Sequence, residues 1–328
     1  MKKLSLLLLA FTGLMLFNRC STDVDINADY QQITVVYGLL DPYEDTTYLK
    51  INKAFLGSEN ALIMAKIPDS SEFIEKLDVR IWPEDDPQDI AYFDTITITN
   101  KEEGVFYNPN QIIYYSAFQP ETDKKYILRI LYKETEITSD AATFQFVFTD
   151  ITSPGFAKKI GINDNADPKA VIWNRKEEAP RYDLTIRFHY KELMEGSADT
   201  VYRFFDWHKD TKKALIGPEV ESYYTGSTFY AALTAFVPYE DAAKEAKVTD
   251  RFTSTLQFIV EAGGKELNTY MEVNEPSSSI IQDRPAYTNI TNGIGIFSSR
   301  ATAIKPKKLN DVTVAYIKGS YSWLKFRY

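Results

Sequence analysis

The chain has 328 residues, of which 44% are hydrophobic and 25% are charged. This composition is typical of a folded globular protein and excludes disordered and collagen-like classes. The 46 acidic residues outnumber the 37 basic ones, which gives a net charge of −9. Because nucleic-acid binding needs clustered Lys and Arg against phosphate, we expect no nucleic-acid partner. The length predicts two domains.

The first residues have the pattern of an export signal. Met1, Lys2 and Lys3 precede a mostly apolar run that ends at Phe17. A basic start followed by a short apolar run is typical of a secretory signal peptide, and this run is too short to span a bilayer comfortably. We therefore predict that residues 1–19 are a signal peptide. The alternative, a buried core helix, is disfavoured by the two lysines.

Cys20 follows this segment directly and is the only cysteine of the chain. It resembles the lipid-acceptor residue of bacterial lipoproteins. Because the chain has no second cysteine, an internal disulfide is excluded. Arg19 stands where such proteins usually have a small residue, and the alternative is a chance cysteine near a cleavage site. We predict lipidation of Cys20 and a polar tether over residues 20–32. No other apolar stretch is long enough to predict a membrane span.

Short strands follow at regular spacing over residues 33–150. The clearest covers residues 126–133, where Tyr126, Leu128 and Ile130 share one face. Further strands are predicted at residues 33–37, 48–51, 77–82, 91–99, 111–118 and 144–148, and one short helix at residues 59–66. About seven strands of this kind are typical of an immunoglobulin-like β-sandwich. We expect residues 33–150 to form one that folds by itself.

A turn-rich segment at residues 150–154 predicts the boundary to a second domain, residues 151–328. Strands are predicted there at residues 181–190, 200–207, 255–260, 311–317 and 321–328, and helices at residues 227–236, 240–247 and 265–273. The predicted fold class is therefore mainly β: an immunoglobulin-like β-sandwich followed by a second β-rich domain with a few inserted helices.

Two stretches carry a resemblance to a known family. One is Val36-Tyr37-Gly38-Leu39-Leu40-Asp41-Pro42, continuing to Gly57, and the other is residues 289–300, Asn-Ile-Thr-Asn-Gly-Ile-Gly-Ile-Phe-Ser-Ser-Arg. With the lipoprotein-like start, they resemble an uncharacterised family of Bacteroidota outer-membrane lipoproteins. The resemblance implies an outer-membrane lipoprotein, often found alongside TonB-dependent transporters. It implies no activity and no catalytic residue.

The second of these stretches contains two glycines in a run that otherwise favours a strand. Gly293 and Gly295 predict a bulge or a close backbone approach. A phosphate-binding loop would need a helix to follow, and the sequence after Gly295 does not resemble a helix start. We therefore expect residues 289–300 to be a structural feature of the second domain.

Residues with catalytic or metal-binding potential are sparse. His189 and His208 have no second His or Cys at ligand spacing, so no zinc site and no cofactor are expected. Neither a nucleophile elbow nor a zinc-protease motif is present in the sequence. The acidic clusters at residues 84–89 and 163–167 offer oxygen ligands for calcium, with Asp/Asn-rich turns as the alternative.

Paired aromatic residues are the remaining signal. The candidate ligand-binding residues are Trp207, Tyr223, Tyr224 and Tyr230, whose rings would form a platform for sugars, peptides or a protein if exposed. The alternative is that these rings are buried between a sheet and the inserted helices.

Together, these features predict a non-enzymatic, lipid-anchored envelope protein. It would act at the outer membrane as a binding or assembly partner, for example of a transporter, on either face of that membrane. The first alternative is a structural or adhesive surface protein, such as the subunit or anchor of an appendage. A glycan or peptide hydrolase is the least favoured alternative.

Overall fold

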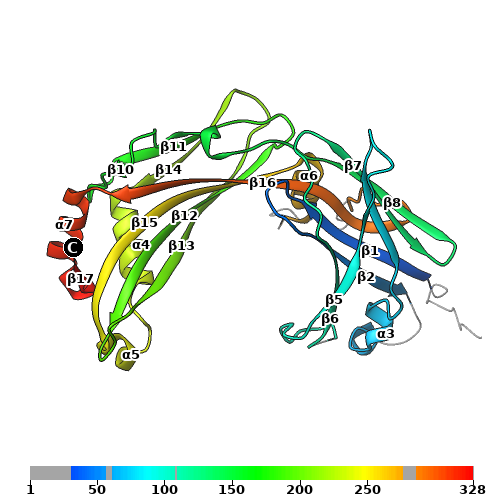
Figure 1. Cartoon of the computed structure of the whole chain (residues 1–328), viewed down its shortest axis with the longest axis horizontal. Coiled ribbons are helices and arrows are strands. Elements are labelled where there is room, and N and C mark those ends of the chain that lie inside the picture. Colours follow the sequence, from blue (N-terminus) through cyan, green and yellow to red (C-terminus); the bar gives the residue numbers. More distant parts are fainter. Residues whose placement is uncertain (1–30, 57–60, 108, 276–285, 328) are drawn as a thin grey trace, which may run out of the picture.

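The computed structural model describes residues 31–56, 61–107, 109–275 and 286–327. Residues 1–30, with the predicted signal peptide, Cys20 and most of the tether, lie outside the described residues. The described chain is mainly β, which confirms the predicted fold class at that level. Figure 1 shows two lobes that together form an arch, with strand β16 (Gly293–Leu309) running across its top from one lobe to the other.

The N-terminal lobe contains ten elements from the first part of the chain. They are β1 (Gln31–Leu40), β2 (Thr47–Leu56), α2 (Ala61–Met64), α3 (Pro68–Ser71), β3 (Asp78–Pro83), β4 (Ala91–Tyr92), β5 (Asp94–Ile98), β6 (Gln111–Ser116), β7 (Lys125–Tyr132) and β8 (Thr135–Ala142). A four-stranded sheet, β4-β3-β7-β8, packs against the β1-β2-β6-β5 part of a ten-stranded sheet. Apolar side chains of both sheets, such as Leu49 and Leu128, are fully buried between them.

The C-terminal lobe is built on the other half of the ten-stranded sheet. Its elements are η2 (Phe148–Asp150), β9 (Ile151–Ser153), β10 (Lys159–Ile160), β11 (Pro168–Asn174), β12 (Arg181–Met194), β13 (Thr200–Lys213), β14 (Glu219–Thr225), α4 (Gly226–Phe236), α5 (Ala242–Ala246), β15 (Val248–Gly263), α6 (Lys265–Asn274), α7 (Asp311–Ser320), η3 (Ser322–Leu324) and β17 (Phe326–Arg327). Along β12, every second side chain from Tyr182 to Tyr190 is buried, as the alternating pattern predicts. These side chains share a core with α4, α7 and the small sheet β14-β11-β9.

Strand β16 belongs to both lobes. Its first part pairs with β1 in parallel, from Gly293 opposite Thr34 to Ser299 opposite Leu40. Its second part pairs antiparallel with β15, starting at Arg300 opposite Gly263. The ten-stranded sheet is therefore continuous across the junction.

The assignment of residues 289–300 to the second domain is wrong. Ile290 and Phe297 are buried in the core of the N-terminal lobe, because the first part of β16 pairs with β1. Residues 33–150 therefore obtain one strand of their larger sheet, and part of their core, from the other end of the chain.

Several local predictions differ from the structure. Residues 311–317 form helix α7 and not a strand, because Asn310 caps the helix and Val314 and Ile317 are buried at helical spacing. Of the predicted strand at residues 321–328, the described part, residues 321–327, contains a 3-10 turn and only the two-residue strand β17. Phe144 and Phe146 are buried as their alternation suggests, but residues 144–147 form no strand.

The predicted helices agree better with the structure. Those at residues 227–236, 240–247 and 265–273 correspond to α4, α5 and α6, and Thr225 caps α4. The helix at residues 59–66 corresponds to α2 where it is described. Among the described residues, no helix is both long and apolar enough to cross a membrane.

Candidate functional site

A groove lies where α6 crosses the junction between the lobes. It is on the face of the ten-stranded sheet that turns away from both cores, and its volume is about 590 Å3. Ligand pockets in proteins commonly have volumes of this order. Strands β1, β2 and β16 form its floor, and α6 forms one wall.

Helix α6 is held in place by the small residues of β16. The backbone N–H of Gly264 donates to the Ser299 carbonyl at 2.9 Å, and the Leu267 N–H donates to Ser298 Oγ at 3.1 Å. A Cβ on Gly264 would lie about 3 Å from both serines, so a glycine is needed for this close approach. The helix then directs Leu267, Tyr270 and Met271, at i, i+3 and i+4 spacing, into the groove.

Two tyrosines connect the wall of the groove to its floor. The rings of Tyr37 on β1 and Tyr270 on α6 meet edge to face, with centroids 6.2 Å apart. The Tyr270 hydroxyl donates to the Tyr37 hydroxyl at 3.4 Å. Hydrogen bonding between the two hydroxyls, followed by burial, raises the pKa of Tyr37 to about 12.

An ion pair forms one end of the groove. Arg300 Nε lies 3.3 Å from Asp41 Oδ2, and Asp41 Oδ1 accepts the Tyr43 N–H at 3.0 Å. Burial raises the pKa of the Asp41 carboxyl, while the Arg300 guanidinium opposes that shift. The Arg300 side chain is 45% exposed. Its fork of N–H donors can therefore also bind a carboxylate or carbonyl group from outside.

A smaller hollow of about 160 Å3 continues the groove into the C-terminal lobe. It shares Leu39, Leu267 and Met271 with the larger one and adds Asp183 and Glu261. These two acids lie opposite each other on β12 and β15. Arg181 and Arg300 line this hollow as well, so the whole surface has apolar side chains along its length and charged side chains of both signs at this end. At the other end, Lys50 lines the groove, and burial lowers its pKa.

The structure does not bring the four aromatic residues predicted as a platform together on the surface. Tyr224 and Tyr230 are buried in the C-terminal core, where the Tyr230 hydroxyl donates to the Ile162 carbonyl at 2.7 Å. Trp207 is partly buried against the same core and meets Tyr224 edge to face. Only Tyr223 is largely exposed, at 49%. The rings thus pack mainly in the core, which was the alternative for these residues.

The histidines and acidic clusters do not form a common site in the described part of the chain. His189 Nε2 lies 2.9 Å from Gln257 Oε1 on the exposed face of β12. Asp164 accepts hydrogen bonds from the hydroxyls of Tyr316 and Tyr321. No group of three His, Cys, Asp or Glu side chains suited to a metal ion is found among the described residues.

Comparison with protein-family models and with curated protein sequences gives no match for this chain. The groove was not predicted, but most of its lining residues outside α6 come from the two stretches singled out in the sequence. Tyr37 and Asp41 lie in the first stretch, and Ile296 and Arg300 lie in the second. Predicting the groove would have required knowing that these two stretches pair as β1 and β16, and no local sequence pattern indicates that pairing.

Proposed function

We propose that this protein is a lipid-anchored envelope protein that binds a partner protein in the groove beneath α6 and catalyses no reaction. The partner would be an outer-membrane protein such as a transporter. The observation that carries the proposal is the groove itself, which has an apolar centre between charged ends. Protein partners are commonly bound by such combinations of apolar contact area and a few placed charges.

The exposed rings of the groove support binding of a protein segment. Tyr48 is 56% exposed and Tyr37 is 39% exposed, although both lie beside a largely apolar surface. Tyrosines in such positions supply much contact area at low entropic cost and often dominate binding energy. The continuation toward Asp183 and Glu261 lengthens the surface, which fits an extended segment better than a compact small molecule.

The polar groups of the groove support a role without catalysis. Asp41 is engaged with Arg300, and Tyr37 is engaged with Tyr270. A nucleophile activated by a neighbouring base is the usual feature of a hydrolase site. In this groove, the Asp41–Arg300 pair instead connects the turn after β1 with β16, and the Tyr37–Tyr270 pair connects β1 with α6.

Affinity capture from detergent-solubilised outer membranes tests the proposal. Tyr48→Ala removes an exposed ring inside the groove, and Tyr92→Ala removes a ring that is 60% exposed on β4 in the other sheet of the lobe. We expect Tyr48→Ala to weaken capture of a specific membrane protein about tenfold, since a central tyrosine commonly contributes more than about 1 kcal/mol. The matched Tyr92→Ala variant should capture it as the unmodified protein does.

Equal capture by both variants would contradict binding in the groove. Capture of appendage subunits in place of a transporter would favour the structural or adhesive alternative.

A further inference from the structure

An exposed apolar patch lies at one end of the N-terminal lobe, away from the groove. Its members come from two segments, residues 61–67 with helix α2 and the loop at residues 101–107. We call these side chains the α2 patch: Leu62, Ile63, Ile67, Val105 and Phe106, each between 42% and 61% exposed. The Tyr107 N–H donates to the Ala65 carbonyl at 2.9 Å and joins the two segments into one surface.

The backbone beneath the α2 patch is hydrogen-bonded. The N–H groups of Lys66 and Ile67 donate to the carbonyls of Ile63 and Met64 at 3.1 and 3.0 Å, and Ala65 is buried below them. A surface can enter an apolar phase only if its backbone polar groups are satisfied internally. The patch meets that condition at this turn.

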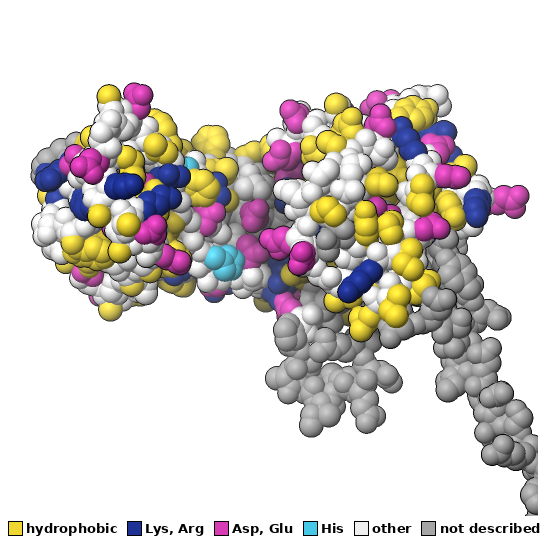
Figure 2. Space-filling view, turned by 90° about the horizontal axis from the view of Figure 1, so that it is seen from below, with side chains coloured by type: hydrophobic (Ala, Val, Ile, Leu, Met, Phe, Trp, Pro, Cys, Tyr) yellow, Lys and Arg dark blue, Asp and Glu magenta, His cyan; other side chains and the backbone are white. Residues whose placement is uncertain are grey.

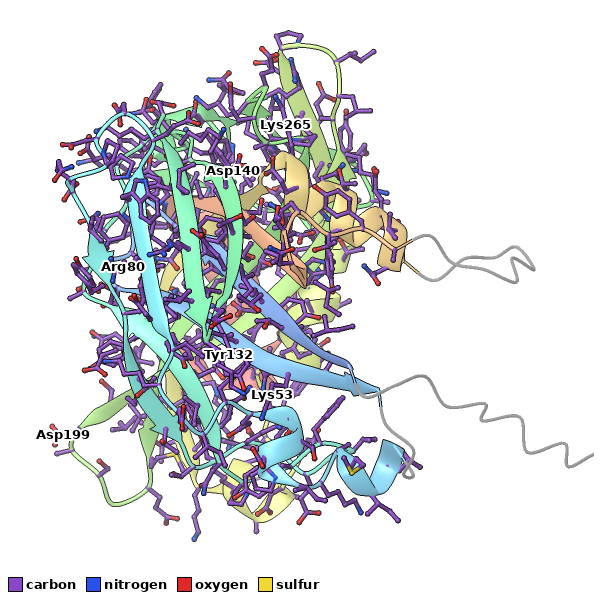
Figure 3. All side chains as sticks on the ribbon, turned by 90° about the vertical axis from the view of Figure 1, so that its right-hand side faces the viewer. Lys53, Arg80, Tyr132, Asp140, Asp199 and Lys265 are labelled. Carbon is purple, nitrogen blue, oxygen red and sulfur yellow. The ribbon has the colours of Figure 1, made fainter. Side chains whose placement is uncertain are left out.

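Contacts with β2 hold the neighbouring helix α3 in place. Asn52 Nδ2 donates to the Ser71 carbonyl at 3.2 Å, and Lys53 Nζ lies 3.2 Å from Asp69 Oδ1. Figure 3 shows Lys53 directly above the short helices, on the side of the lobe where β1 begins. Helix α3, which follows Ile67 of the α2 patch directly, is therefore held against β2.

The α2 patch lies close to the point where the predicted tether joins the body. Gln31, the first residue of β1, pairs with Leu56 at the end of β2. Helix α2 begins five residues after Leu56, a length of chain that spans at most about 18 Å. Cys20 precedes Gln31 by eleven residues, which reach at most about 40 Å. A lipid on Cys20 would therefore hold this end of the molecule near the membrane.

We infer that the α2 patch inserts into the lipid bilayer that carries the anchor and fixes the orientation of the protein on it. The inference rests on the lipid anchor at Cys20 that is part of the proposed function. In Figure 1, α3 stands at the foot of the N-terminal lobe, on the side toward which the arch opens. Figure 2, viewed from that side, shows hydrophobic side chains gathered over the underside of this lobe. Insertion would therefore turn the concave face toward the membrane.

The charges next to the α2 patch fit a bilayer surface. The chain as a whole has a net charge of −9, which would repel it from anionic lipid headgroups. In the two segments of the patch, however, Lys66 and Lys101 balance Glu102 and Glu103, and the neighbouring Asp69 is paired with Lys53, so these segments carry no net charge toward the lipid. A single lipid chain binds a protein to a membrane only reversibly, and a second apolar contact with the bilayer strengthens that binding.

A fluorophore at the patch tests the inference. In the lipidated protein the only native thiol is blocked, so Ile63→Cys and Ile216→Cys each supply a single labelling site. Ile216, which is 86% exposed in the β13–β14 turn, is the control. Each protein is labelled with an environment-sensitive dye and incorporated into phosphatidylethanolamine–phosphatidylglycerol vesicles, with and without nitroxide-labelled lipid. We expect a shift to shorter wavelength and quenching at position 63, and a water-like signal at position 216.

A second variant checks that the whole patch is responsible. Adding Phe106→Asp to the Ile63→Cys protein should return the dye to a water-like emission while circular dichroism stays unchanged. A water-like signal at position 63 without this change would overturn the inference. A shift of the dye emission to shorter wavelength in native outer membranes but not in pure lipid vesicles would also overturn it, because a protein would then cover the patch.

The labelling itself separates this inference from the proposed anchor. Two dyes per chain, counted by mass spectrometry, would show that Cys20 carries no lipid, which contradicts the anchor and this inference together. One dye per chain with a water-like signal contradicts only the insertion of the α2 patch. Binding in the groove is measured separately by capture with the Tyr48→Ala variant.

Discussion

Replacing Gly295 by alanine should destabilise the junction of the two lobes. Gly295 has φ = +112° and pairs with Val36 of β1. A Cβ at this position would overlap the Val36 carbonyl oxygen, far inside van der Waals contact. The backbone conformation costs an L-residue about 1–3 kcal/mol. Moving β1 away would also weaken at least one ladder hydrogen bond, at about 1 kcal/mol. We therefore expect a loss of about 3 kcal/mol.

Thermal unfolding measured by circular dichroism gives the readout. With an unfolding entropy of about 2 cal/mol/K per residue over roughly 300 ordered residues, a loss of 3 kcal/mol lowers Tm by about 5 °C. Gly104→Ala is the matched control, because nothing lies within 4 Å of its added Cβ, and its Tm should change by less than about 1 °C. If the two variants melt at the same temperature, β16 does not pair with β1 as described.

Further predictions concern the two cores and the anchor. Arg251→Met removes the fully buried partner of Glu192, whose carboxylate then keeps only the half-exposed Arg203 and the Tyr239 hydroxyl, and should cost about 3 kcal/mol in urea unfolding. The exposed Arg327→Met should cost less than about 1 kcal/mol. Burial raises the pKa of three core tyrosines from 10.0 to about 12: Tyr182, Tyr190 and Tyr224. Their contribution to stability is complete below pH 10 and is lost as the pH rises toward 12, so the last part of the tyrosinate absorbance should appear only together with unfolding in that range. A fragment of residues 28–150 lacks the β16 side chains of its core and should show no cooperative urea transition. Cys20→Ala should move the protein from washed membranes to the soluble fraction.

The predictable part of this fold is the part that depends on local pattern. The alternation in β12 and the i, i+3, i+4 spacing of Leu267, Tyr270 and Met271 in α6 each reflect one element facing one core or one sheet. Both were predicted with the correct type. The apolar residues of α7 predict a strand as readily as a helix because a short run fits either period, and only the cap at Asn310 distinguishes the two.

The groove could not be predicted in this way. It exists because β16 changes partner between Ser299 and Arg300, from a parallel to an antiparallel neighbour. Tyr37 and Tyr270 meet across 233 positions of sequence, and their contact depends on that change. A single sequence carries no local signal for which strands pair over such distances.

Photo-crosslinking in intact cells tests the central claim most directly. A photoreactive amino acid in place of Tyr48 lies within the groove, and the same residue in place of Tyr92 lies on the opposite sheet with similar exposure. We expect position 48 to crosslink to one outer-membrane protein, identified by mass spectrometry, and position 92 not to do so. Crosslinking of the same proteins at both positions, or of none at position 48, would contradict binding in the groove.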